Sequence, residues 1–355
     1  VQPLTTGTTV INVTVPGFRN VAGALGTTVT VTAPALTLNA ITNLGAGLQV
    51  GASGSLNAAQ HGGISLVIRS SNPALVRVSA SATVAATDSI IVPLANGAAS
   101  FSYIVAAEDG VTGTASITAS AVGFTQDVAT VTVVPSAIQL SGLLATRTAF
   151  GADDPFQVQV GIPVANNTAL NVTQARRAGA PPLVVTLSSA TAAVGSLVTT
   201  ALVDDTVTVE IAGAASASPA TVAAGGVAMR YLSAGTTVVR ATHPTLPTMS
   251  TNGVQTVTVT APTVTLAAIP TVGAGLQVAA TGSLSGLQHG GTNVVIRSND
   301  PSRVLVARNA TELASDSIVI AVADGITAFS YVVAGVEGTT GTPTLTAQAI
   351  GHTAG

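Results

Sequence analysis

The sequence predicts an all-β protein made of tandem β-sandwiches, and three observations lead to this prediction. The chain contains a long internal repeat, which is typical of an array of similar modules. Valine, threonine, alanine and glycine carry most of the chain, and valine and threonine favour strands. Short apolar runs alternate with turn residues, and no stretch combines a helical period with helix caps.

The repeat keeps strict register. The hexapeptide Gly-Ala-Gly-Leu-Gln-Val begins at Gly45 and again at Gly273, and the context Gln-His-Gly-Gly surrounds both His61 and His289. Phe-Ser-Tyr begins at residues 101 and 329, so each pair is 228 residues apart. The sequence therefore predicts a two-domain repeat unit of 228 residues, followed by somewhat more than half of the next unit.

This register divides the chain into modules of two types, A and B, of a size typical of single sandwiches. The predicted parts are the C-terminal strands of a partial type B module at 1–33, a type A module at 34–135, a type B module at 136–261, and a type A module lacking its last strand at 262–355. Because both ends fall inside modules, we expect a window from a longer chain. We also expect a vacant sheet edge in the last module unless another strand fills it.

Strand runs and turn residues place the elements within the modules. Strands are expected at 8–15, 27–33, 36–40, 48–52, 65–70, 76–79, 89–94, 98–106, 115–121, 129–134, 183–187, 205–211, 236–241 and 257–260. Glycine, asparagine and proline mark turns at 62–63, 72–73, 96–97 and 109–110. The type B module carries extra sequence at 165–182 and 213–226, which we expect to form loops with a contact of their own.

Composition excludes several classes of protein. Charged residues are 7% of the chain and hydrophobic residues 47%, so the signature of disorder is absent. All eleven basic residues are arginine and form no basic stripe, so nucleic acid is not expected as a partner. Cysteine is absent, which removes disulfides and thiolate metal sites. Threonine and serine interrupt the apolar runs well before the roughly 18 residues of a spanning helix, so no membrane span is expected.

Several motifs together resemble the bacterial immunoglobulin-like repeats of large cell-surface and secreted proteins. They are Ser70-Ser71-Asn72-Pro73, Asp88-Ser89-Ile90-Ile91-Val92, Ala98-Ala99-Ser100-Phe101-Ser102-Tyr103, Gly113-Thr114-Ala115-Ser116-Ile117-Thr118-Ala119 and Ala129-Thr130-Val131-Thr132-Val133. The resemblance implies tandem immunoglobulin-like sandwiches exported to the cell exterior, where such arrays form stalks, adhesins, surface layers or filaments. The tryptophan and paired cysteines of antibody-type domains are absent, so no disulfide pins the core.

The repeated histidines could bind a metal or act as a base, but a metal site needs several converging ligands. We favour turn histidines that pack or hydrogen-bond locally. The acidic pairs at 153–154 and 204–205, with Asn299 and Asp300, could supply oxygen ligands for calcium, yet turn and strand-end roles are favoured. No arrangement of residues typical of catalysis is present, so we expect no enzyme activity, no catalytic residue, no metal site and no cofactor.

Three further groups of residues are candidates for contacts. Arg69 and Arg297 lie inside apolar strands, where each faces solvent or a neighbouring molecule. Phe101 and Tyr103, like their repeat partners, share one face of a strand, which favours core packing over a sugar-stacking platform. Asn12, Asn166, Asn171 and Asn309 fit the N-glycosylation sequon, although chance matches are expected in a threonine-rich chain.

A surface with so few charges repels other copies of the protein only weakly. We therefore interpret self-association as the functional state of the protein. We therefore expect a structural, extracellular protein, the repeat-built subunit of a cell-surface filament, sheath or surface layer whose partners are copies of itself. The alternative is the stalk of a bacterial adhesin or carbohydrate-binding surface protein, with the type B insertions as the glycan contact.

Overall fold

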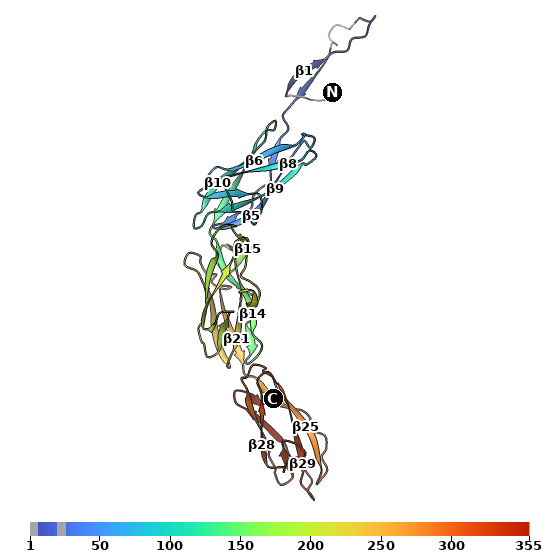
Figure 1. Cartoon of the computed structure of the whole chain (residues 1–355), viewed down its shortest axis with the longest axis vertical. Coiled ribbons are helices and arrows are strands. Elements are labelled where there is room, and N and C mark those ends of the chain that lie inside the picture. The colour runs from blue at the N-terminus through green and yellow to red at the C-terminus, as the bar shows by residue number, and fades with distance from the viewer. Residues whose placement is uncertain (1–5, 20–25, 355) are drawn as a thin grey trace. The chain divides into compact units, whose positions relative to one another are not determined.

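The computed structural model describes residues 6–19 and 26–354, and its regular structure is almost entirely β (Figure 1). Within these ranges the single helical element is the short 3-10 helix η1 (Val222–Ala224), and no described helix is long and apolar enough to cross a bilayer. The strands form several sheets that pair into β-sandwich-like domains, which confirms the all-β prediction. The chain separates into two compact units.

Unit 1 comprises the residues up to Ser136 together with Gln174–Pro181 and Gly213–Ala215. It begins with a two-stranded sheet of β1 (Gly7–Ile11) and β2 (Thr27–Val31). The first sandwich follows. Its outer sheet has the order β4 (Leu44–Gly45), β11 (Asp127–Val134), β10 (Gly113–Ser120), β6 (Ile64–Ser70) and β8 (Ser89–Leu94). Its second sheet has the order β16 (Ala175–Arg176), β5 (Leu48–Leu56), β9 (Ser100–Ala107) and β7 (Val76–Ser79), with β3 (Leu36–Leu38) also paired to β5.

Alternation along the strands builds the core of the first sandwich. In β6, Leu66 and Ile68 are fully buried, whereas Val67 and Arg69 between and beyond them are exposed. Because successive side chains of a strand point to opposite faces, one face of the sheet lines the core and the other meets solvent. The facing sheet contributes Phe101, whose ring stacks on that of Tyr103 at 6.2 Å between centroids.

A glycine opposite this aromatic ring is required by close packing. Gly54 pairs with Phe101 across β5 and β9, and a Cβ atom on Gly54 would collide with the Phe101 ring. Gly282 and Phe329 repeat this arrangement in the third sandwich. The repeat therefore conserves a packing detail of the core as well as its apolar pattern.

Unit 2 contains the second and third sandwiches. The second sandwich has one sheet in the order β12 (Ala137–Ser141), β14 (Asp154–Pro163), β21 (Val227–Tyr231), β18 (Gly195–Val198) and β19 (Val203–Asp204), with β15 (Leu170–Thr173) paired to β14. Its other sheet has the order β13 (Thr146–Thr148), β23 (Val254–Thr260), β22 (Gly235–Thr242), β17 (Leu183–Ser189) and β20 (Thr206–Ile211).

The third sandwich repeats the first. One sheet has the order β27 (Val304–Ala307), β29 (Ala328–Gly335), β25 (Gln277–Leu284), β24 (Thr263–Leu266) and β31 (Thr353–Ala354), and the other has the order β28 (Ser317–Val322), β26 (Thr292–Ser298) and β30 (Leu345–Ala349). Tyr331 is among its most buried side chains, as Tyr103 is in the first. Within the described residues, β30 pairs only with β26, whereas β10 of the first sandwich pairs on both sides.

The two insertions of the predicted type B module are more ordered than the loops we expected. The stretch 165–182 contains β15 and β16, and the stretch 213–226 contains η1. Gln174–Pro181 and Gly213–Ala215 belong to unit 1, although in sequence they lie between strands of the second sandwich. Sequence position alone therefore does not say which compact unit a segment joins.

Candidate interface sites

The most elaborate polar site of unit 1 is formed by an inserted segment, Gln174–Pro181, which we call the arginine segment. Its strand β16 pairs antiparallel with the start of β5, so that Arg176 lies opposite Leu48. The receiving surface, which we call the first rim, consists of residues 43–49 with Glu108 and Asp109. Pairing a short strand to an open sheet edge supplies main-chain hydrogen bonds and fixes the register of the side chains.

Arg176 is buried, with 4% of its surface exposed. Its Nη1 donates to the Gly47 carbonyl at 3.0 Å and to Asp109, and its Nη2 donates to Asp109 Oδ2 at 3.2 Å. Both Nε and Nη2 donate to the Pro181 carbonyl at 3.2 Å. An arginine has five N–H donors in a fixed planar fork, and here each has an acceptor. Such saturation is the condition under which a buried guanidinium is tolerated.

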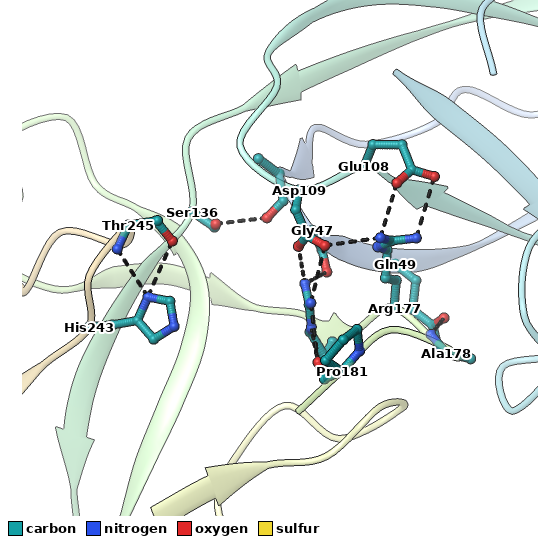
Figure 2. Close-up of polar contacts among 12 residues, drawn as sticks. Gly47, Gln49, Glu108, Asp109, Ser136, Arg177, Ala178, Pro181, His243 and Thr245 are labelled. Carbon is teal, nitrogen blue, oxygen red and sulfur yellow. Dashed lines mark hydrogen bonds and ion pairs between the residues drawn. The ribbon is translucent and has the colours of Figure 1, made fainter. Parts of the chain in front are cut away.

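Arg177 extends the network towards solvent. Figure 2 shows its guanidinium facing the Glu108 carboxylate, with contacts of 3.0 and 3.3 Å, and its Nη2 also lies 2.9 Å from Asp109 Oδ2. Arg77 reaches the same Glu108 carboxylate at 2.9 Å. Burial alone would raise the pKa of Asp109, but the hydrogen bonds and positive charges of the two arginines outweigh it and hold that pKa below its ordinary value.

Amide side chains complete the attachment of the arginine segment. Gln174 accepts from the Gly45 amide through Oε1 at 2.8 Å and donates through Nε2 to the Asn43 carbonyl at 2.8 Å. From the rim, Gln49 Oε1 accepts from the Ala178 amide at 2.9 Å (Figure 2). Both glutamines are buried, so each bond replaces one lost to water.

The sequence predicted neither the role of Arg176 and Arg177 nor their partners. Two signals were present. The arginines form the single Arg-Arg dipeptide of a chain with 7% charged residues, and Glu108-Asp109 is one of its few acidic pairs. Their approach depends on the fold, because nearly 70 residues separate them in sequence.

The repeated histidines have the local role that we favoured. His61 Nδ1 accepts from the Gly63 amide at 3.1 Å, and its Nε2 lies 3.0 Å from the Ala98 carbonyl, so Nε2 carries the proton. His289 makes the same two contacts, at 3.1 Å to Gly291 and 2.9 Å to the Ile326 carbonyl. Both ring nitrogens are thus engaged, and the described residues contain no group of three or more histidine, aspartate or glutamate side chains that could hold a metal ion.

The acidic residues considered for calcium have partners of other kinds. The Asp153 carboxylate accepts hydrogen bonds from Nε and Nη2 of Arg230 at 2.9 and 2.7 Å. The Asp154 carboxylate accepts from Arg147 at 3.1 Å and from the Tyr231 hydroxyl at 3.0 Å. Burial and then the nearby Asp154 charge raise the pKa of Tyr231.

Asp300 and Asp204 each contact a residue close by in sequence. Asp300 pairs with Arg303 at 2.7 Å, and Asp204 accepts from the amide of Asp205 at 2.7 Å. These contacts are the turn and strand-end roles that the sequence favoured.

Arg69 and Arg297 occupy equivalent places on the outer faces of the first and third sandwiches. Both are exposed, and neither guanidinium makes a hydrogen bond or ion pair among the described residues. Arg69 lies beside Ser89 of β8 and Thr118 of β10. Whether a neighbouring molecule contacts them stays a prediction.

The apolar residues next to these arginines are exposed or half-buried. In the first sandwich Val67 pairs with Ile91, with 38% and 67% of their surfaces exposed, and in the third Val295 pairs with Val319, which is 49% exposed. We call the solvent-facing side of the β6 and β8 sheet, and its counterpart in the third sandwich, the outer face. It presents aliphatic and hydroxyl side chains with one arginine each, and in the third sandwich also the amide side chains of Asn293 and Gln348.

The paired aromatics fill the cores, as predicted. Phe101 and Tyr103 are 6% and 1% exposed, and Phe329 and Tyr331 are 7% and 1% exposed. The hydroxyls of Tyr103 and Tyr331 are buried without a hydrogen-bond partner among the described residues. Burial raises the pKa of Tyr103 to about 12 and raises that of Tyr331 as well.

The four sequon asparagines are exposed. Asn166 Oδ1 accepts from the Thr168 hydroxyl at 2.8 Å, and Asn309 Oδ1 accepts from the Thr311 hydroxyl at 2.9 Å, each within its own sequon. Asn12 follows β1, and Asn171 lies in β15. Their positions leave them accessible, and their modification stays a prediction.

One open hollow of about 620 Å³ lies in unit 2 and is lined by aromatic, apolar and small polar residues, among them Phe150, His289, Asn293 and Ile350. Phe150 adopts φ 60°, an uncommon left-handed conformation for a bulky residue. Its carbonyl accepts from the amides of Leu287 and Gln288 at 2.8 Å each. The left-handed conformation of Phe150 therefore accompanies these two backbone hydrogen bonds in unit 2.

No protein-family model and no curated protein sequence matches this chain. Among solved structures, the chain is similar to the crystal structure of trypsin-activated alpha-2-macroglobulin from Escherichia coli, with 13% sequence identity and a TM-score of 0.20. The alignment covers 90% of this chain and 23% of that chain, so this chain spans less than a quarter of its length.

Proposed function

We propose that this chain is a structural protein, a repeat-built subunit of a cell-surface filament, sheath or surface layer that assembles through contacts between immunoglobulin-like sandwiches. Its partners are then copies of itself, its place is outside the cell, and it performs no catalysis. The sandwiches act as rigid spacers, and their exteriors supply the lateral contacts.

The outer face is the observation that carries this proposal. Val67 and Ile91 lie side by side on an exposed sheet surface, and Val295 and Val319 repeat the pair 228 residues later. Covering aliphatic side chains with a neighbouring surface removes them from water and lowers the free energy. A nearly uncharged face also lacks the repulsion that keeps soluble proteins apart.

The arginine segment supports the same proposal from another side. A segment inserted between strands of the second sandwich packs onto the first rim with all donors of Arg176 satisfied. Buried polar contacts of this kind are best known for fixing one register among several.

Electron microscopy of the purified chain tests the proposal. Long fibres or ordered sheets that form as the concentration rises are the expected result, and monodisperse monomers at high concentration would contradict it. Val67→Glu combined with Ile91→Glu should weaken association by placing like charges on the outer face. Val122→Glu combined with Leu313→Glu is the matched control, because these residues are 94% and 93% exposed and lie outside the strands of that face.

A stalk that carries a glycan-binding surface is the second candidate. The observation that favours it is the exposed turn at residues 165–167, where Asn167 adopts φ 54°. Gln174, Arg176 and Ala178 of this insertion are buried in unit 1. Binding to a glycan array that disappears in Asn167→Ala, while the fibres persist, would favour this function.

A further inference from the structure

The third sandwich repeats residues 45–49 of the first rim as residues 273–277, but in a different environment. The third rim, residues 271–277 with Val336 and Glu337, corresponds position by position to the first rim. Leu48 is 1% exposed, whereas its counterpart Leu276 is 65% exposed. Residues 44–49 are all buried, and residues 273–277 are all exposed.

Two different segments cover the first rim. The end of β11 pairs with β4, and Ser136 Oγ donates to the Ala46 carbonyl at 2.8 Å, which covers the beginning of the rim. The arginine segment covers the remainder, because β16 pairs with Leu48 and Gln49 at the edge of β5. The burial of Leu48 and Gln49 is therefore tied to the arginine segment.

The corresponding edge of the third sandwich is open. Strand β24 pairs with the far end of β25, from Gly282 to Leu284, just as β3 pairs with the far end of β5. Among the described residues, no strand pairs with that edge near Gln277. An open edge of this kind is a template for a further strand.

We propose that the third rim is the docking site for an arginine segment of the Gln174–Pro181 type, carried by another sandwich of the second kind. The occupant is identified by the first rim, where the same hexapeptide receives such a segment in the same chain. The inference rests on the proposed function and deepens it, because it names one contact through which the array assembles.

The charges of the third rim fit one of the two arginines best. Asp109 corresponds to Glu337, so the carboxylate that receives Arg176 in the first rim is retained. Arg77 and Glu108, which pair with each other, are replaced together by Leu305 and Val336. The third rim therefore keeps a carboxylate for the buried arginine and for one ion pair of Arg177, and it loses the two ion pairs made by Glu108.

A single-cysteine experiment tests the docking, because the chain contains no cysteine of its own. Leu276→Cys is introduced into the full chain, into a chain extended after Gly355 by a second copy of residues 128–136, and into one extended by a second copy of residues 128–261. The extensions continue the register of the repeat and hold the added segment at high effective concentration. A fourth chain carries the long extension with the added copies of Arg176 and Arg177 changed to alanine.

Maleimide should label Cys at position 276 rapidly in the parent and in the short extension. With the long extension the rate should fall at least about tenfold, which corresponds to about 1.4 kcal/mol of protection. The alanine changes should restore rapid labelling. Rapid labelling with the intact long extension would overturn the proposal, and so would protection by the short extension or protection that survives both alanine changes.

Hydrogen exchange provides a second measurement in chains that keep Leu276. Exchange at Gln277 should slow with the long extension only, and exchange within the added strands verifies that the added sandwich is folded. Slow exchange of the added strands without protection at Gln277 would also overturn the proposal. Electron microscopy of the same samples separates this inference from the proposed function, because protection without fibres would contradict only the function.

Discussion

The first and third sandwiches share their core and differ at their rims. Tyr103 and Tyr331 are each 1% exposed, whereas the rim residues Leu48 and Leu276 are 1% and 65% exposed. The cores agree because each sandwich closes its core with its own strands. The rims differ because Leu48 is covered by a segment that comes from elsewhere in the chain. The same leucine therefore contributes to stability in the first rim and not in the third, because only the first rim is covered by another segment.

Truncating the rim leucines should separate these roles most strongly. Leu48→Ala removes a buried side chain and leaves a cavity, so we expect it to destabilise unit 1 by about 2–5 kcal/mol. Leu276→Ala removes an exposed side chain and should change stability by no more than about 0.5 kcal/mol. Hydrogen exchange of β5 and β25, measured in the same samples, gives both values. Equal effects would show that the rims do not differ in solution.

Removing the buried arginine should produce the next largest effect. Arg176→Ala breaks the charge-assisted bonds to Asp109, so we expect a loss of about 1.5–3 kcal/mol and faster exchange at Leu48 and Gln49. Arg69→Ala is the matched control, because Arg69 is exposed on the outer face, and its effect should stay within about 0.5 kcal/mol. A loss no greater than that of the control would mean that the arginine segment does not hold the rim.

Substitutions of the buried tyrosines test whether the cores of the first and third sandwiches are equivalent. Tyr103→Phe and Tyr331→Phe should each leave stability unchanged or raise it slightly, because they remove a buried hydroxyl with no partner among the described residues. Tyr231→Phe should cost about 1 kcal/mol, because that hydroxyl donates to Asp154 at 3.0 Å. Urea denaturation monitored by hydrogen exchange of each sandwich measures all three. Different results for Tyr103 and Tyr331 would contradict the equivalence of the two cores.

Acidification should have the smallest effect, and of the two rims it should act on the first, which contains Asp109. The pKa of Asp109 is lowered in the folded chain, so its carboxylate contributes stability above the ordinary aspartate pKa of about 3.9, and this contribution is lost as the pH falls through the lowered value. The protection of the Leu48 and Gln49 amides, corrected for the pH dependence of exchange in an unfolded chain, should therefore be unchanged near neutral pH and fall below about pH 4. Acceleration already near neutral pH would exclude Asp109 as the cause.

The sequence predicted most strands of the first sandwich, but it missed β12, β14, β18 and β21 of the second. The strands Val76–Ser79 and Ser89–Leu94 have the predicted bounds, because alternating apolar residues and flanking turn residues define them locally. It did not predict β4 and β16, since each is two residues long and exists only through its partner strand. The same reason explains the missed site, because no local signal joins Arg176 to Asp109.

The candidate residues also divide into those whose role follows from local sequence and those whose role does not. The turn role of His61 follows from a few neighbouring residues, so its context was sufficient to predict it. The core position of Phe101 follows from strand alternation. Which molecule meets Arg69 depends on an assembly that a single chain does not contain.

The contact between the arginine segment and the first rim joins two unlike surfaces. A symmetric dimer requires a surface that complements itself, and this contact offers none. If the array assembles through this contact, the series has a direction, because one terminus carries an unoccupied rim and the other carries an arginine segment without a rim. Growth from these termini would then proceed at unequal rates, as in any polar polymer.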